Sequence, residues 1–102
     1  MSIELTETNQ LKTAYNRMYA ILSDYIWDYD VVEALVDVEL ETYKVFPDIE
    51  SLRSKIRSLR MRVRQVADDE SRIMDAIDTF SDAVDDIEEV YAKIVYPKEV
   101  SL

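Results

Sequence analysis

The stretch IESLRSKIRSLRMRV, residues 49–63, places an apolar side chain at every third or fourth position. A β-strand would alternate with a period of two, whereas this spacing keeps the apolar side chains on one face of an α-helix. The pattern continues towards the C-terminus without a slip, and Glu70 is its only polar member. Its positions are Ile49, Leu52, Ile56, Leu59, Val63, Val66, Glu70, Ile73, Ile77, Phe80, Val84, Ile87, Tyr91 and Ile94. Such a strict seam predicts a coiled coil or a long bundle helix.

A second run with the same spacing precedes Pro47, which suits a helix start because proline needs no N–H there. Its positions are Leu11, Tyr15, Met18, Leu22, Tyr25, Tyr29, Val32, Val36, Glu39, Tyr43 and Phe46. Further apolar residues flank this seam and the later part of the first run, so both stripes are wide. A wide stripe must be covered by more than one neighbour. We therefore expect a three- or four-helix bundle, or a dimer that completes one.

Two polar segments predict where the long runs break. DVVE, residues 30–33, is typical of a capping box in which Asp30 caps a helix and Glu33 reaches back to it. DDES, residues 68–71, offers a second cap. We therefore predict an all-α fold, an antiparallel helical bundle of about four helices. The alternative is two long helices that form a coiled-coil hairpin and dimerise.

The length supports a single helical domain spanning 1–102. FPDIESL at 46–52 recurs as YPKEVSL at 96–102, and each copy closes a helical run. This recurrence raises the hypothesis of an internal duplication, in which 1–50 and 51–102 are two helix-turn-helix repeats.

The composition excludes most catalytic and metal chemistry. The chain has no glycine, no cysteine and no histidine. Sheet hairpins need glycine in their turns, whereas thiol nucleophiles, imidazole acid–base groups and most zinc or haem sites need the other two. Carboxylates remain as ligands for hard cations, but a calcium loop also requires glycine at its turn. No nucleophile–base pair or phosphate loop is visible, so we predict no enzyme, no cofactor and no metal site.

Net charge and hydropathy restrict the partners. The formal net charge is −10, so nucleic acid and anionic membranes should repel the chain on average. The sequence has no run of about 18 apolar residues, and its N-terminal MSIELTETNQ lacks the basic and apolar segments of a signal peptide. We therefore expect a cytoplasmic protein, in the host cytoplasm if the chain is viral. Its expected partner is another protein or a second copy of itself, as a homodimer.

Half of the basic residues fall between positions 53 and 64. They are Arg53, Lys55, Arg57, Arg60, Arg62 and Arg64. If the chain reverses near Pro47, these cations lie beside the acidic residues of 30–41 and pair with them, which fixes register and partner choice. Nucleic-acid binding along this stretch is an alternative, and the net charge counts against it.

The sign of the charge reverses between residues 68 and 89. Six carboxylates lie there on one helical face, away from the seam: Asp75, Asp78, Asp82, Asp85, Asp86 and Glu89. A solvated helix face is the simplest interpretation. The alternative is that this acidic stripe imitates a DNA backbone, which would make the chain an inhibitor of a host DNA-binding enzyme.

SDYIWDYDVV, residues 23–32, holds the only tryptophan of the chain. Tyr25 and Tyr29 fit the apolar seam, whereas Trp27 points away from it if the helix is continuous. At a helix corner, the Trp27 ring can cover the junction. Otherwise it is a candidate anchor for a partner, because tryptophan and tyrosine are enriched at interface hot spots.

Together these patterns favour an acidic, non-enzymatic protein–protein interaction or structural module. A small viral or accessory protein fits this absence of catalytic chemistry. The hypothetical partner-binding residues are Trp27, Tyr25, Tyr29, Arg53, Arg57, Arg60, Arg64, Asp78, Asp82 and Asp85.

Overall fold

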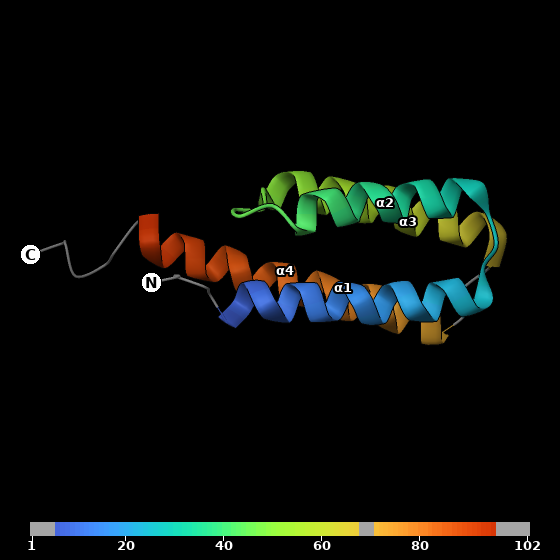
Figure 1. The fold of residues 1–102 in the computed structure, drawn as a ribbon, viewed down its shortest axis with the longest axis horizontal. Helices are drawn as coiled ribbons and strands as arrows, with labels where there is room; N and C mark the ends of the chain where they lie inside the picture. The colour runs from blue at the N-terminus through green and yellow to red at the C-terminus, as the bar shows by residue number, and fades with distance from the viewer. Residues whose placement is uncertain (1–5, 68–70, 96–102) are drawn as a thin grey trace, which may run out of the picture.

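Four helices alternate in direction along one long axis in the computed structural model, which describes residues 6–67 and 71–95 (Figure 1). They are α1 (Thr6–Tyr25), α2 (Tyr29–Thr42), α3 (Ile49–Ala67) and α4 (Ser71–Val95). The predicted all-α antiparallel bundle of four helices is therefore confirmed. The alternative of two long helices is wrong, because each of the two runs is divided: the first leaves the helical conformation at residues 26–28, and the second forms the separate helices α3 and α4.

The helices pack as two antiparallel pairs. α1 lies mainly against α4 and α2 mainly against α3, while contacts of α3 with α4 and of α1 with α2 join the pairs. Figure 1 shows the α2–α3 pair stacked on the α1–α4 pair, with α4 extending past the others at its C-terminal end. The particle measures 53 × 28 × 19 Å. Because α2 packs against α3 and α1 only on its inner side, its outer face lies at the surface of the bundle.

The N-terminus of α2 is capped by Asp28. Its carboxylate accepts hydrogen bonds from the backbone N–H groups of Asp30 at 3.0 Å and Val31 at 3.2 Å. These donors have no partner inside the helix, so an acidic side chain at this position stabilises the first turn. The predicted capping box was wrong by two residues, because Asp30 already lies within the first turn of α2.

Asp48 caps α3, since its carboxylate accepts the backbone N–H of Ser51 at 3.0 Å. α3 begins at Ile49, two residues after Pro47, so the helix start expected at this proline is confirmed, with Asp48 as the capping residue. The second predicted cap falls on residues 68–71, of which 68–70 lie outside the described residues. The repeated motif at 96–102 also lies outside them, so the internal duplication stays a prediction.

The seam predicted for α3 and α4 forms half of the core. Its buried members are Leu52, Ile56, Leu59, Val63, Ile73, Ile77, Phe80, Val84 and Ile87. Val66 departs from the prediction because its side chain is 48% exposed near the end of α3. Within the part of the chain that the structure describes, no helix is both long and apolar enough to cross a bilayer.

The seam predicted for the first half is correct in α1 as far as Leu22, and it is wrong at Tyr25, the last residue of α1, and in α2. In α1, Leu11, Tyr15, Met18 and Leu22 are buried as predicted. In and around α2 the predicted members Tyr25, Tyr29, Val32, Val36, Tyr43 and Phe46 are exposed. The core side of α2 is formed by Val31, Ala34, Leu35 and Val38. The break at residues 26–28 explains the error, because a helical phase is not carried across non-helical residues.

Candidate protein-interaction surface

α2 carries a second apolar face that the bundle does not cover. Tyr29, Val32, Val36 and Leu40 are spaced by three or four residues, so they line one side of the helix. Their side chains are 79%, 45%, 43% and 65% exposed, respectively. The core residues of α2 lie on the opposite side. We call the four exposed residues the α2 face.

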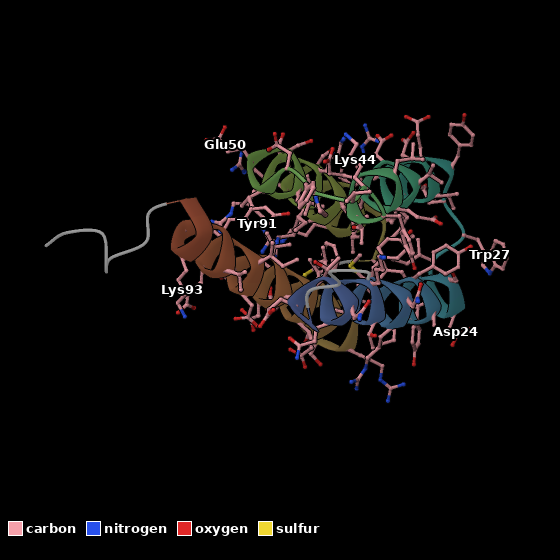
Figure 2. All side chains as sticks on the ribbon, turned by 60° about the vertical axis from the view of Figure 1, so that its left-hand side comes forward. Asp24, Trp27, Lys44, Glu50, Tyr91 and Lys93 are labelled. Carbon is pink, nitrogen blue, oxygen red and sulfur yellow. The ribbon has the colours of Figure 1, made fainter. Side chains whose placement is uncertain are left out.

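Large apolar side chains also lie at both ends of this face. Trp27, in the link between α1 and α2, is 91% exposed, and Figure 2 shows its ring at the end of the molecule, pointing away from the helices. The expectation that the Trp27 ring covers the junction between α1 and α2 is therefore wrong. Val45 and Phe46, in the link between α2 and α3, are exposed as well. Exposed apolar side chains gathered along and beside one helix face are typical of interaction sites on soluble proteins.

Tyr25 has a different environment from Trp27 and Tyr29. Its hydroxyl accepts a hydrogen bond from Nη1 of Arg72 at 2.6 Å, and the guanidinium carbon lies 5.8 Å from the ring centroid. The side chain is thus held at the α1–α4 pair, where a cation over an aromatic face is favourable. The structure therefore does not bring Tyr25 into the α2 face with Tyr29.

Acidic residues flank the α2 face on both sides. Asp30, Glu33 and Asp37 follow one edge and Glu39 lies on the other, all exposed. α2 itself, residues 29–42, contains neither lysine nor arginine. Arg62 of α3 reaches this edge, with its Nη1 3.8 Å from the Glu33 carboxylate. The surface is therefore an apolar stripe inside an acidic rim.

Glu41 ties the end of α2 to the start of α3. Its side chain is only 2% exposed, and its carboxylate accepts the backbone N–H of Asp48 at 2.9 Å and the hydroxyl of Ser51 at 3.1 Å. The ammonium groups of Lys44 and Lys55 lie 3.0 and 3.5 Å from it. A buried carboxylate is tolerated only when hydrogen bonds and cations replace the lost water, and here both do.

These contacts lower the pKa of Glu41 from 4.5 to about 2. The hydrogen bond from the Asp48 backbone is the largest cause, and those from Lys44 and Ser51 add to it. Burial acts in the opposite direction and is outweighed. Sequence reasoning missed Glu41. The available signal was that Glu41 follows Val38 by three positions on the core side of α2.

Tyr15 anchors α2 from the α1 side. Its buried hydroxyl donates a hydrogen bond to the backbone carbonyl of Leu35 at 2.9 Å, and Oε1 of Glu39 lies 3.3 Å away. Its ring meets those of Phe80 and Tyr43 edge-on, with centroids 6.0 and 6.3 Å apart. Burial, and next the negative charge of Glu39, raise the pKa of the Tyr15 hydroxyl. α2 is thus held by polar contacts from both neighbours.

The basic stretch of α3 pairs within the chain, and its partners are divided between two helices. Arg53 contacts Asp85 at 2.8 Å and Glu88 at 2.6 Å, while Arg60 contacts Asp78 at 2.8 Å, all on α4. Lys55 and Arg62 contact carboxylates of α2. The prediction that all six cations face residues 30–41 was therefore wrong for Arg53 and Arg60, because α3 lies between α2 and α4.

The remaining candidate residues are dispersed. Arg57 and Arg64 are exposed on α3, and Asp82 is exposed on the acidic stripe of α4. Because arginines form ion pairs with Asp78 and Asp85, the acidic stripe of α4 carries less unpaired negative charge than the sequence indicated. Among the described residues, no group of three carboxylates is placed to hold a metal ion. A hollow of about 340 Å³ between α1 and α4, lined by Arg17 and Asp75 among others, is open to solvent.

The residues proposed from the sequence thus form no single site, and only Trp27 and Tyr29 belong to the apolar surface along α2. Comparison with protein-family models, with curated proteins and with solved structures finds no match to this chain.

Proposed function

We propose that this chain is a non-enzymatic protein–protein interaction module that binds its partner through the α2 face. The observation that carries the proposal is the exposure of Tyr29, Val32, Val36 and Leu40 along the whole helix. α2 is the only described helix whose two opposite faces are both rich in large apolar residues. One face packs into the bundle, and the other is left for a partner.

The size of the surface supports this proposal. Aromatic side chains carry about 150–250 Å² each, so the exposed parts of Trp27, Tyr29 and Phe46 together amount to roughly 500 Å². The three aliphatic residues of the α2 face add to this area. A standard interface takes about 800 Å² from each partner, which the face and its two ends approach.

The anchoring of α2 also favours binding. Glu41 holds one end of the helix to α3, and Tyr15 holds its middle to α1. A helix that is already ordered loses little further entropy when a partner docks on it. Tryptophan and tyrosine at one end of the face are residues that commonly dominate binding energy.

Site-specific crosslinking tests the proposal. A photo-crosslinking amino acid at position 36, compared with one at the exposed apolar position Met61 of α3, should give discrete adducts from position 36 alone. Mass spectrometry identifies the adduct, and the purified partner is then titrated against the chain. We expect Leu40→Lys to weaken binding by about tenfold or more and Met61→Lys to leave it unchanged. Equal adducts from both positions, or binding indifferent to Leu40→Lys, would contradict the proposal.

A further inference from the structure

We infer that the occupant of the α2 face is an amphipathic helix of another protein, flanked by lysine or arginine, and not a second copy of this chain. The inference rests on the proposed function and specifies the chemistry of the partner. It is carried by the shape of the α2 face and by the charges around it.

The shape suits a helix. α2 has 14 residues and is about 21 Å long at 1.5 Å per residue. Val32, Val36 and Leu40 follow one another at intervals of four residues, which forms the ridge that most often packs into the groove of a neighbouring helix. Trp27 and Phe46 are exposed beyond the two ends of α2. A partner helix of about five turns would cover the ridge and reach both aromatic side chains.

The rim determines the charge of the partner. Asp30, Glu33 and Asp37 follow one edge of the face, and Glu39 lies on the other. Arg62 reaches the first edge, where its Nη1 donates to the backbone carbonyl of Asp30 at 3.1 Å and lies 3.8 Å from the Glu33 carboxylate. Among the described residues, the carboxylates of Asp37 and Glu39 form no ion pair. A helix that docks on the apolar ridge brings its own flanking residues next to these carboxylates. Basic flanks would gain attraction there, while acidic flanks would be repelled.

The same rim disfavours a second copy. In an antiparallel two-fold dimer through α2, the edge with Asp30, Glu33 and Asp37 would meet the same edge of the other copy. In a parallel dimer, that edge would meet the one with Glu39. Both arrangements oppose acidic residues to acidic residues, because α2 contains no lysine or arginine. Like charges across an interface select against that partner.

The test uses two synthetic helical peptides of about 18 residues, or five turns, with the same leucine and isoleucine face. One carries lysine at every flanking position and the other carries glutamate. Each is titrated against the full chain by fluorescence anisotropy. We expect the lysine peptide to bind at least about tenfold more tightly, and the advantage to shrink between about 0.05 and 0.5 M salt.

Two pairs of variants locate the binding. Leu40→Lys should weaken binding of the lysine peptide by about tenfold or more, whereas Met61→Lys on α3 should not. Asp37→Lys should weaken it more than Asp82→Lys, which makes the same charge reversal on the acidic stripe of α4. All four positions are exposed, so the fold should be retained, and circular dichroism checks this. Equal effects of Asp37→Lys and Asp82→Lys would overturn the inference, because attraction to net charge alone would then explain binding.

The outcomes separate this inference from the proposed function. If both peptides bind equally and Leu40→Lys abolishes both, the face binds helices but the charge inference is overturned. If light scattering shows a dimer that Leu40→Lys dissociates, and neither peptide binds, the occupant is a second copy and the inference is overturned alone. If neither peptide binds and the chain stays monomeric, the inference is overturned, and crosslinking from position 36 decides the proposed function separately. If the chain binds zwitterionic lipid vesicles through Leu40 instead, the inference and the proposed function both fail.

Discussion

Replacing Glu41 by glutamine should destabilise the protein strongly at neutral pH and progressively less as the pH falls. Glutamine keeps the shape and one acceptor oxygen but loses the charge that Lys44 and Lys55 face. The contacts of the carboxylate lower its pKa from 4.5 to about 2. At about 1.4 kcal/mol per pKa unit, this difference corresponds to roughly 3 kcal/mol of stability from the charged form. That is a large part of the 5–15 kcal/mol typical of a domain.

The pH dependence follows from the direction of this pKa change. Because the folded-state pKa lies below the unfolded value, the folded state binds fewer protons than the unfolded state in that range. The stabilisation is therefore fully present above pH 4.5 and is lost as the pH falls from there towards 2. Other carboxylates affect wild type and variant alike, so the difference between the two isolates Glu41.

Urea unfolding followed by far-ultraviolet circular dichroism measures this effect. The wild type and Glu41→Gln are compared at about pH 7 and at steps between about pH 5 and pH 3. Glu33→Gln on the same helix is the matched control, since that exposed carboxylate should contribute only about 0–1 kcal/mol. The reasoning is refuted if Glu41→Gln costs less than about 0.5 kcal/mol at neutral pH, or if its cost stays constant on acidification.

Three further changes test the caps, the anchor and the exposed ring. Asp28→Ala should lower the free energy of unfolding in urea by about 1 kcal/mol because it removes the cap of α2, whereas Asp30→Ala should lower it much less. The reverse order would support the capping box expected from the sequence. Tyr15→Phe should lower the free energy of unfolding by about 1–2 kcal/mol, because the buried Leu35 carbonyl loses its side-chain donor. In an absorbance titration of the wild type, Tyr15 should ionise after the exposed tyrosines, and its ionisation together with them would contradict the buried environment. Trp27→Ala should leave the melting temperature within a few degrees of wild type, and the emission of Trp27 should resemble that of a solvated indole; a large loss of stability would mean that its ring is packed.

Much of the fold follows from the sequence. The absence of glycine and the spacing of apolar residues by three and four indicate helices, because only a helix places such residues on one face. For α1, α3 and α4 the same spacing also predicts the core, since each of these helices has one dominant apolar face. Leu11, Leu59 and Phe80 are buried where the pattern places them.

The tertiary structure decided the core-facing side of α2, and with it the candidate site. Val31, Leu35 and Val38 have the spacing of a core face, and so do Val32 and Val36. The sequence determined that α2 has two apolar faces but not which one the bundle covers, because the phase of a helix relative to its neighbours is set by packing across the whole bundle.

The buried charge was likewise decided by the fold. Glu41 lies seven residues before Asp48 and ten before Ser51 in the sequence, and nothing in that spacing shows that both donate to it. The composition determined that the chain is acidic and helical. Only the turn between α2 and α3 brings these donors to one carboxylate, because burial of a charge depends on groups from both helices meeting in space.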